Sequence, residues 1–194
     1  CNAFLIYENE DKENITDKLN YNSLDNTIFY NIEDINTKIM LDFKKNPESL
    51  SELFSGSSAI EIIFDENFNS QNVNSLRRTF QKCNKLISVD LSHFNTENVD
   101  DMYETFSECS SLLELNLSSF KTNKLRDMLG MLSGCSSLTS IDLSMFNTSL
   151  VTDMQNLFYQ CISLTSINLN SFDTRSVGSF AFMFYSCINL ALID

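Results

Sequence analysis

Five of the six cysteines are evenly spaced, and thiols are the strongest metal ligands and nucleophiles in this chain. Cys83, Cys109, Cys135, Cys161 and Cys187 lie 26 residues apart, whereas Cys1 is out of phase. Metal sites usually take ligands from close pairs such as C-x-x-C, and the chain has none. Cysteines one repeat apart would stack about 5 Å from each other, within disulfide range but pointing the same way. We expect free, buried thiols that fill a core, with occasional disulfides or metal ligation as the alternative.

His93 is the single histidine, and Asp90 and Ser92 stand close to it in the sequence. A catalytic His needs a nucleophile and an orienting acid nearby. The neighbouring repeats keep the Ser and the Asp or Asn but lack the His, and only four glycines are present, too few for a glycine-rich phosphate loop. We therefore predict that the protein is not an enzyme, with no catalytic residue, no cofactor and no metal site.

A column of alternating Asp and Asn recurs with the same 26-residue period, at Asp90, Asn116, Asp142, Asn168 and Asp194. Carboxylates stacked about 5 Å apart would repel by about 1 kcal/mol or more per neighbouring pair, and interleaved Asn removes that repulsion. Three interpretations stay open: a structural hydrogen-bond ladder, a polar face that recognises a protein or glycan, and a weak Ca²⁺ site. The spacing lacks the pattern of a dedicated calcium loop.

The predicted binding face combines this column with its two outward neighbours along the same strands. In the first full unit the equivalent outward positions are Ile62, Phe64 and Glu66. The face consists of Ser88, Asp90, Ser92, Glu114, Asn116, Ser118, Ser140, Asp142, Ser144, Ser166, Asn168 and Asn170.

The elements that position these residues follow from the pattern of one 26-residue unit. In residues 84–109 an L-x-x-L-x-L pattern predicts a short strand, in which Val89 and Leu91 point inward. Asp101 is a good N-cap, and Met102, Phe106 and Cys109 have the i, i+4, i+7 spacing of a two-turn helix. One unit cannot bury its own apolar face, but a stack can. We predict an α/β solenoid with a parallel β-sheet on one face and short helices on the other.

Five full units cover 58–83, 84–109, 110–135, 136–161 and 162–187, and a final strand follows. Residues 58–194 are therefore predicted to form the repeat region. Residues 35–57 form a degenerate first rung, and residues 1–34 form an N-terminal cap, since terminal repeats are atypical. The expected inward columns begin at Ile60 and Leu86 and at Ile63 and Val89.

The bulk properties restrict the partners. The 194 residues carry a net charge of −13, which disfavours nucleic acid and anionic membrane surfaces. No run of apolar residues approaches the 18 needed for a transmembrane helix, and no signal peptide is visible.

The stretch LTSIDLSMFNTSLVTDMQNLFYQC (residues 138–161) resembles the repeat of BspA-like leucine-rich-repeat surface proteins, most closely the variety found in mycoplasma surface lipoproteins. The resemblance covers residues 58–194. Leu132 replaces the expected Phe, and Gly130 and Gly134 loosen the third predicted helix. The resemblance implies a non-enzymatic protein at the cell surface, with adhesion to a host or partner-cell protein or glycan as the function. It also implies a lipidated N-terminal Cys, which Cys1 would supply, as the only route to a membrane.

The last unit differs from the others, because Phe182, Tyr185 and Leu192 put apolar groups at outward positions. The chain stops inside a strand, so we expect either further repeats or another molecule at this edge. The alternative function is therefore a structural module that self-associates end to end.

Overall fold

The computed structural model describes residues 46–64 and 68–194 in full, together with the backbone of five strands before them. The described residues contain nine strands and no helix. The strands are β1 (Asn2–Ile6), β2 (Lys12–Asn14), β3 (Leu19–Asn22), β4 (Thr27–Tyr30), β5 (Lys38–Asp42), β6 (Glu61–Phe64), β7 (Ser88–Val89), β8 (Ser166–Ile167) and β9 (Leu192–Ile193).

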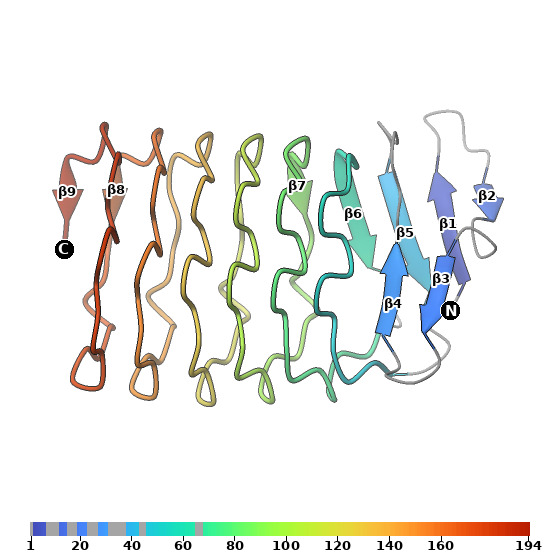
Figure 1. Cartoon of the computed structure of the whole chain (residues 1–194), viewed down its shortest axis with the longest axis horizontal. Helices are drawn as coiled ribbons and strands as arrows, with labels where there is room; N and C mark the ends of the chain where they lie inside the picture. The colour runs from blue at the N-terminus through green and yellow to red at the C-terminus, as the bar shows by residue number, and fades with distance from the viewer. Residues whose placement is uncertain are drawn as a thin grey trace.

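The largest sheet has the strand order β2-β1-β5-β6-β7. Strands β5, β6 and β7 are parallel, and β1 runs antiparallel to β5 and to β2. Strands β3 and β4 form an antiparallel pair, and β8 and β9 form a parallel one. Figure 1 shows the later units side by side along the long axis, in chain order from β6 to β9. The boundaries of the predicted cap and first rung remain predictions, and Cys1 lies outside the described residues.

The prediction of short helices is wrong for every described unit. In residues 101–109, alternate backbone N–H groups donate to the following unit, as Glu104 does to Leu129 O at 2.9 Å and Phe106 to Met131 O at 2.9 Å. The residues between them close tight turns, such as Ser107 N to Glu104 O at 3.1 Å. An α-helix would instead need each N–H to reach the carbonyl four residues earlier. The backbone here satisfies its donors across units, so the segment is a chain of overlapping turns.

A left-handed residue recurs every fourth position of these turn segments. The φ angles of Glu104 and Glu108 are 50° and 61°, and those of Gly130 and Gly134 are 59° and 75°. A positive φ at the third residue of a turn is typical of type II turns and cannot continue a right-handed helix. Gly130 and Gly134 were the sequence signal for this conformation, because glycine adopts it without steric cost. The other units have non-glycine residues at these positions, such as Arg78, Asn156 and Phe182, and these do not indicate a positive φ from the sequence.

The predicted parallel sheet is also less continuous than expected. Leu86 and Val89 are 0 % and 8 % exposed although they lie three residues apart. Two inward residues at that spacing break the period-2 alternation of a strand. As a result only two residues of the segment, Ser88 and Val89, extend the ladder from β6. Units 110–135 and 136–161 have no assigned strand at this place.

The first full unit is shifted by one residue relative to the prediction. Ile62 pairs with Val89 and is 0 % exposed, so it belongs to the inward column that we assigned to Ile63. Phe64 packs on the core, with its ring centroid 4.6 Å from that of Phe94. The prediction that Ile62 and Phe64 point outward is therefore wrong. The shift arises because buried Ala59 lies two positions after Ser57, whereas in the next unit buried Leu86 lies three positions after Cys83.

The core consists of columns of equivalent residues from successive units. Phe54 and Phe80 stack at 5.5 Å and Phe80 and Phe106 at 5.2 Å, with nearly parallel rings. Leu132 takes the next place in the column, and the aromatic stack resumes with Phe158 and Phe184 at 5.4 Å. The predicted burial of Cys83, Cys109, Cys135 and Cys161 is confirmed, and Cys187 is half-buried.

Candidate binding surface

The predicted binding face, called the strand face below, lies on solvent-facing positions of the first segment of each unit. Eleven of its twelve residues are exposed, and Ser88 is half-buried. The residues between them point into the core: Leu115 and Leu117 are 7 % and 1 % exposed. The backbone N–H of Leu113 donates to Ile87 O at 3.3 Å, which holds two neighbouring units in register at this face.

Each Asp or Asn of the central column closes a turn within its own unit. Oδ1 of Asp90 accepts a hydrogen bond from Ser92 N at 2.9 Å, and Oδ1 of Asn116 accepts one from Ser118 N at 3.0 Å. The same bond occurs in the next two units. These are Asx turns, in which the side chain replaces a backbone acceptor. The hydrogen bonds described for this column join no two of its members, so of the three interpretations left open the ladder between units is wrong.

The turn bonds also set the charge state of the two carboxylates. The backbone N–H of Ser92 lowers the pKa of the Asp90 carboxyl, with a smaller effect of the Ser92 hydroxyl. The Ser144 hydroxyl, together with the Ser144 N–H, lowers the pKa of the Asp142 carboxyl. Donors that favour the charged form keep these groups ionised at neutral pH. The backbone bond of the turn uses Oδ1, and both carboxylates lie at exposed positions.

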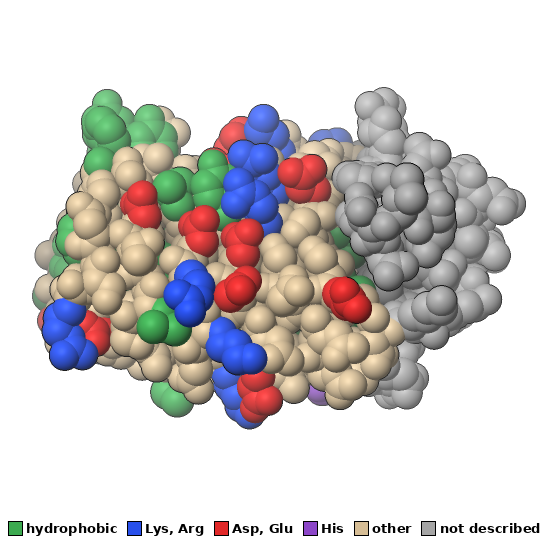
Figure 2. All heavy atoms as spheres, turned by 60° about the horizontal axis from the view of Figure 1, so that its bottom comes forward, with side chains coloured by type: hydrophobic (Ala, Val, Ile, Leu, Met, Phe, Trp, Pro, Cys, Tyr) green, Lys and Arg blue, Asp and Glu red, His purple; other side chains and the backbone are tan. Residues whose placement is uncertain are grey.

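Positive charge is segregated from the strand face. The stretches 86–93, 112–119, 138–145 and 164–171 contain no Lys or Arg. The bases lie elsewhere on the units, and several of them pair with acids, for example Arg78 Nε with Glu104 Oε2 at 2.8 Å and Lys121 Nζ with Glu97 Oε1 at 2.5 Å. Figure 2 shows a face on which basic and acidic side chains lie beside one another. The acids of the strand face have no ion pair within the part of the chain that the structure describes.

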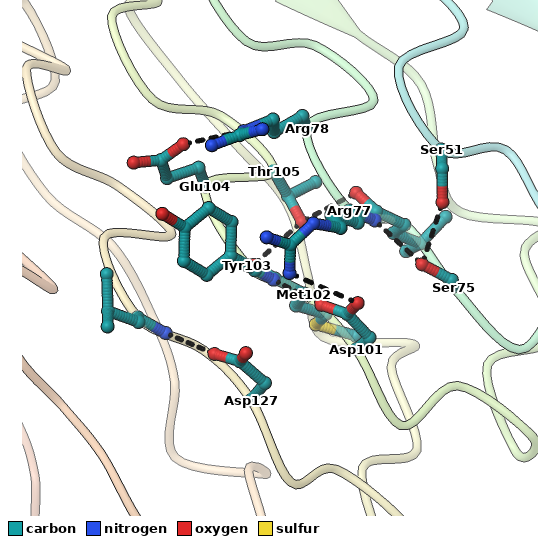
Figure 3. Close-up of polar contacts among 12 residues, drawn as sticks. Ser51, Ser75, Arg77, Arg78, Asp101, Met102, Tyr103, Glu104, Thr105 and Asp127 are labelled. Atoms are coloured by element: carbon teal, nitrogen blue, oxygen red, sulfur yellow. Dashed lines mark hydrogen bonds and ion pairs between the residues drawn. The ribbon is translucent and has the colours of Figure 1, made fainter.

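A polar network on the turn segments joins neighbouring units (Figure 3). The guanidinium carbon of Arg77 lies 3.9 Å from the centroid of the Tyr103 ring, and that of Arg78 lies 5.0 Å away. Glu104 accepts from Arg78, and this hydrogen bond raises the pKa of the Arg78 guanidinium. Gln81 donates to the same carboxylate at 2.7 Å. The network stabilises the stacking of units, so it is not free for a partner. The sequence signal was the opposite charge of Arg78 and Glu104, one period apart.

Exposed apolar residues border the strand face, and the sequence reasoning missed them. Ile87 and Leu113 are 45 % and 57 % exposed, and Met145 is 68 % exposed. The first two follow the first inward Leu of their units, and Met145 precedes the inward Phe146. Their apolar character at positions where other units have Thr or Ser was the available signal.

The three residues predicted for docking at the C-terminal end are all exposed. Phe182, Tyr185 and Leu192 are 63 %, 52 % and 52 % exposed. The Phe182 and Tyr185 rings meet edge to face at 5.9 Å, and Tyr185 stacks on Tyr159 at 5.2 Å. Leu192 belongs to β9 and lies on the strand side. Hydrophobic side chains gather at the end opposite the grey residues in Figure 2.

The cysteine column is built for structure. Each thiol donates to a backbone carbonyl 29 residues earlier, as Cys135 Sγ does to Phe106 O at 3.2 Å. Burial raises the pKa of the Cys135 thiol to about 12, so the reactive thiolate is suppressed. Across residues 46–64 and 68–194 no group of three His, Cys, Asp or Glu is placed to hold a metal ion. The described part of the chain likewise has no helix long and apolar enough to cross a membrane.

Comparison with protein families matches two overlapping segments, residues 48–142 and 113–192, to one family model. The family is described as "Mycoplasma protein of unknown function, DUF285". The two segments together span most of the chain and all the complete 26-residue units. No curated protein matches the chain, and no solved structure matches it.

Proposed function

Because the chain belongs to the mycoplasma DUF285 family, we propose that it is a non-enzymatic adhesion protein of the cell surface, built as a leucine-rich-repeat solenoid of the BspA-like type. In this proposal the strand face contacts a host or partner-cell protein or glycan. Cys1, outside the described residues, would carry the lipid anchor.

The solenoid part of the proposal is supported by the backbone bonds between units. Glu52, Arg78 and Glu104 each donate to the residue 25 positions later, at 2.9 Å in all three cases. A structure in which each unit contacts mainly its neighbours is typical of repeat proteins. Such arrays present extended surfaces whose side chains recur at a fixed spacing.

The single observation that carries the binding function is the composition of the exposed strand face. Its residues alternate over four successive units with Leu, Val and Ile that are buried or, at Leu169, half-buried, yet they make no ion pair among the described residues. Small polar groups without strong internal partners can exchange water for a ligand at low cost. The turn segments differ, because their charged groups are engaged in contacts between units.

The test is attachment of the purified, labelled protein to cultured host cells. Ser140→Arg combined with Ser166→Arg adds two bulky cations to the strand face at exposed side chains. Gln71→Arg combined with Thr152→Arg adds the same charge at exposed positions outside this face. We expect the first pair to reduce attachment at least fivefold and the second pair to leave it unchanged. Equal attachment of the two double variants would refute the role of the strand face.

End-to-end assembly is the second candidate, supported by the exposure of Phe182, Tyr185 and Leu192. Apolar patches of this kind often mark interfaces. Sedimentation should then show a concentration-dependent dimer that Leu192→Asp abolishes. A monomer at all concentrations would exclude assembly and leave adhesion as the function.

A further inference from the structure

The charges on the strand face have one sign. Asp90, Glu114 and Asp142 lie on it, and no Lys or Arg occurs in the four stretches that form it. Elsewhere on the units bases do occur, and some of them pair with acids, as Arg175 does with Asp173 at 2.5 Å. A face that carries acids and excludes bases favours a cationic partner and repels nucleic acid and sulfated or phosphorylated polymers.

Apolar side chains add a second requirement. Ile87 and Leu113 stand in neighbouring units at the start of the strand face, and Met145 stands at its far edge. The equivalent positions of Ile87 are Thr139 and Thr165 in later units, so the fold itself does not require an apolar group there. Side chains that are 45 % and 57 % exposed gain free energy only when a partner covers them. A neutral, strongly hydrated glycan would not use them together with the carboxylates.

The spacing of the carboxylates restricts the partner further. Asp90 and Asp142 are equivalent residues two units apart, and neighbouring chains of a sheet lie about 4.8 Å from each other, so their separation is roughly 10 Å. A peptide in the extended polyproline II conformation has three residues per turn and advances about 3.1 Å per residue, so side chains three residues apart point the same way and span roughly 9 Å. A peptide lying along the stack would therefore bring one cation to each carboxylate.

We propose that the strand face binds an extended, cationic peptide segment of a partner protein, with Lys or Arg every third residue and apolar side chains between them. Asp90 and Asp142 receive the cations at their exposed carboxylates, and Ile87 and Leu113 cover the apolar residues. The inference rests on the proposed function, because it specifies the partner of the same face.

The direct test is fluorescence anisotropy of the full chain with a labelled probe peptide, Lys-Leu-Ser-Lys-Leu-Ser-Lys. Three control peptides are used. The rearranged peptide has the same composition as the probe in the order Lys-Lys-Lys-Leu-Leu-Ser-Ser. The Glu peptide has Glu in place of Lys, and the Leu-free peptide has Ser in place of Leu. We expect saturable binding of the probe that weakens with added salt, about fivefold weaker binding of the rearranged and Leu-free peptides, and none of the Glu peptide. Equal binding of the probe and the rearranged peptide would overturn the proposed spacing.

Isosteric substitutions test the carboxylates without disturbing the fold. Asp90→Asn with Asp142→Asn removes two charges but keeps the Oδ1 acceptor, and Asn116 and Asn168 already close the same turn in neighbouring units. Asp100→Asn with Glu108→Gln removes two charges at exposed positions outside the face. We expect the first pair to weaken probe binding about fivefold or more and the second pair to leave it within twofold. Equal affinities of the two double variants would overturn the proposal.

Leu113→Thr tests the apolar requirement, since Thr occupies this column in two later units. This substitution should weaken binding of the probe peptide severalfold and leave binding of the Leu-free peptide unchanged. The cell-attachment test separates the two levels of inference. If the probe does not bind but Ser140→Arg with Ser166→Arg still abolishes attachment, the cationic-peptide proposal is wrong and the adhesive function stands. If the probe does not bind and the Ser140→Arg, Ser166→Arg variant attaches to cells as well as the wild type, both proposals are wrong.

Discussion

The hydroxyl of Thr122 accepts a hydrogen bond from the backbone N–H of Asn147 at 2.7 Å and donates to the Asn147 carbonyl at 3.3 Å. Thr148 makes the same pair of bonds to Asp173, at 2.8 and 3.1 Å. One buried side chain thus satisfies a donor and an acceptor of the next unit. The partner of each Thr hydroxyl therefore lies in the neighbouring unit.

Thr122→Val should lower the free energy of unfolding by about 1–3 kcal/mol, because it leaves a backbone N–H and a carbonyl without a partner at a residue that is 2 % exposed. Denaturant unfolding measures the change. Thr174→Val, at the exposed equivalent in the last full unit, serves as the control and should change stability by less than about 0.5 kcal/mol. Similar losses of stability for the two variants would show that the two hydrogen bonds between Thr122 and Asn147 do not stabilise the fold.

Gly134→Ala and Gly56→Ala should differ although both residues have φ near 75°. A Cβ at position 134 would come within 3.2 Å of Glu108 Cα, whereas a Cβ at position 56 meets nothing within 4 Å. The Ala variant at 56 should therefore lose about 1 kcal/mol or less, since reduced unfolded-state entropy offsets the left-handed strain, and that at 134 about 2 kcal/mol or more. Thermal and denaturant melts rank the two. A larger loss of stability for Gly56→Ala than for Gly134→Ala would show that the contact with Glu108 does not determine the cost of the substitution.

Asp127→Asn should raise the free energy of unfolding at pH 7. Burial, aided by the negative charge of Asp101, raises the pKa of the Asp127 carboxyl. Folding therefore favours its protonated form, and the fold loses free energy as the pH rises through the unfolded-state and folded-state pKa values. Asn keeps the Oδ1 acceptor that Leu129 N uses at 3.1 Å. The gain should disappear as the pH falls below the unfolded-state pKa, where the carboxyl is neutral in both states.

Asp142→Asn serves as the comparison for Asp127→Asn, because the pKa of the Asp142 carboxyl is shifted in the opposite direction. Hydrogen bonds from Ser144 lower the pKa of the Asp142 carboxyl, so its stabilising contribution is present at pH 7 and is lost as the pH falls through the folded-state pKa. Its Asn variant should show no gain at pH 7 and converge with the wild type in acid. Parallel pH profiles for the two variants would mean that burial does not distinguish the two carboxylates.

Cys135 should make stability fall at alkaline pH. Its pKa is raised by burial from 9.0 to about 12, so the stabilising contribution is complete below pH 9 and is lost as the pH rises from 9 towards 12. Between pH 7.5 and pH 10 the wild type should lose about 1 kcal/mol more than Cys135→Ala. Unfolding by denaturant at the two pH values gives the difference. The same loss in both proteins would assign the alkaline effect to other groups. Native Cys135 should also resist thiol reagents until the chain unfolds.

Much of the inward pattern could be predicted because burial is a property that each unit repeats. Leu86, Leu112, Leu138 and Leu164 are at most 1 % exposed, as their common position in the period predicted. The outward positions of the strand face could be predicted for the same reason. The apolar residues beside it were missed because Ile87 and Leu113 match the pattern of a core, and only their exposure identifies them as surface.

The sequence by itself determined the 26-residue period, the inward columns and the polar outward face, since each depends on side-chain polarity repeated at equal spacing. Only the tertiary structure decided that the second half of each unit is a chain of turns and not a helix. The i, i+4, i+7 spacing of Met102, Phe106 and Cys109 fits both conformations. The choice between them depends on where the backbone N–H of Phe106 finds its acceptor, and that acceptor, Met131 O, lies 25 residues away in the next unit.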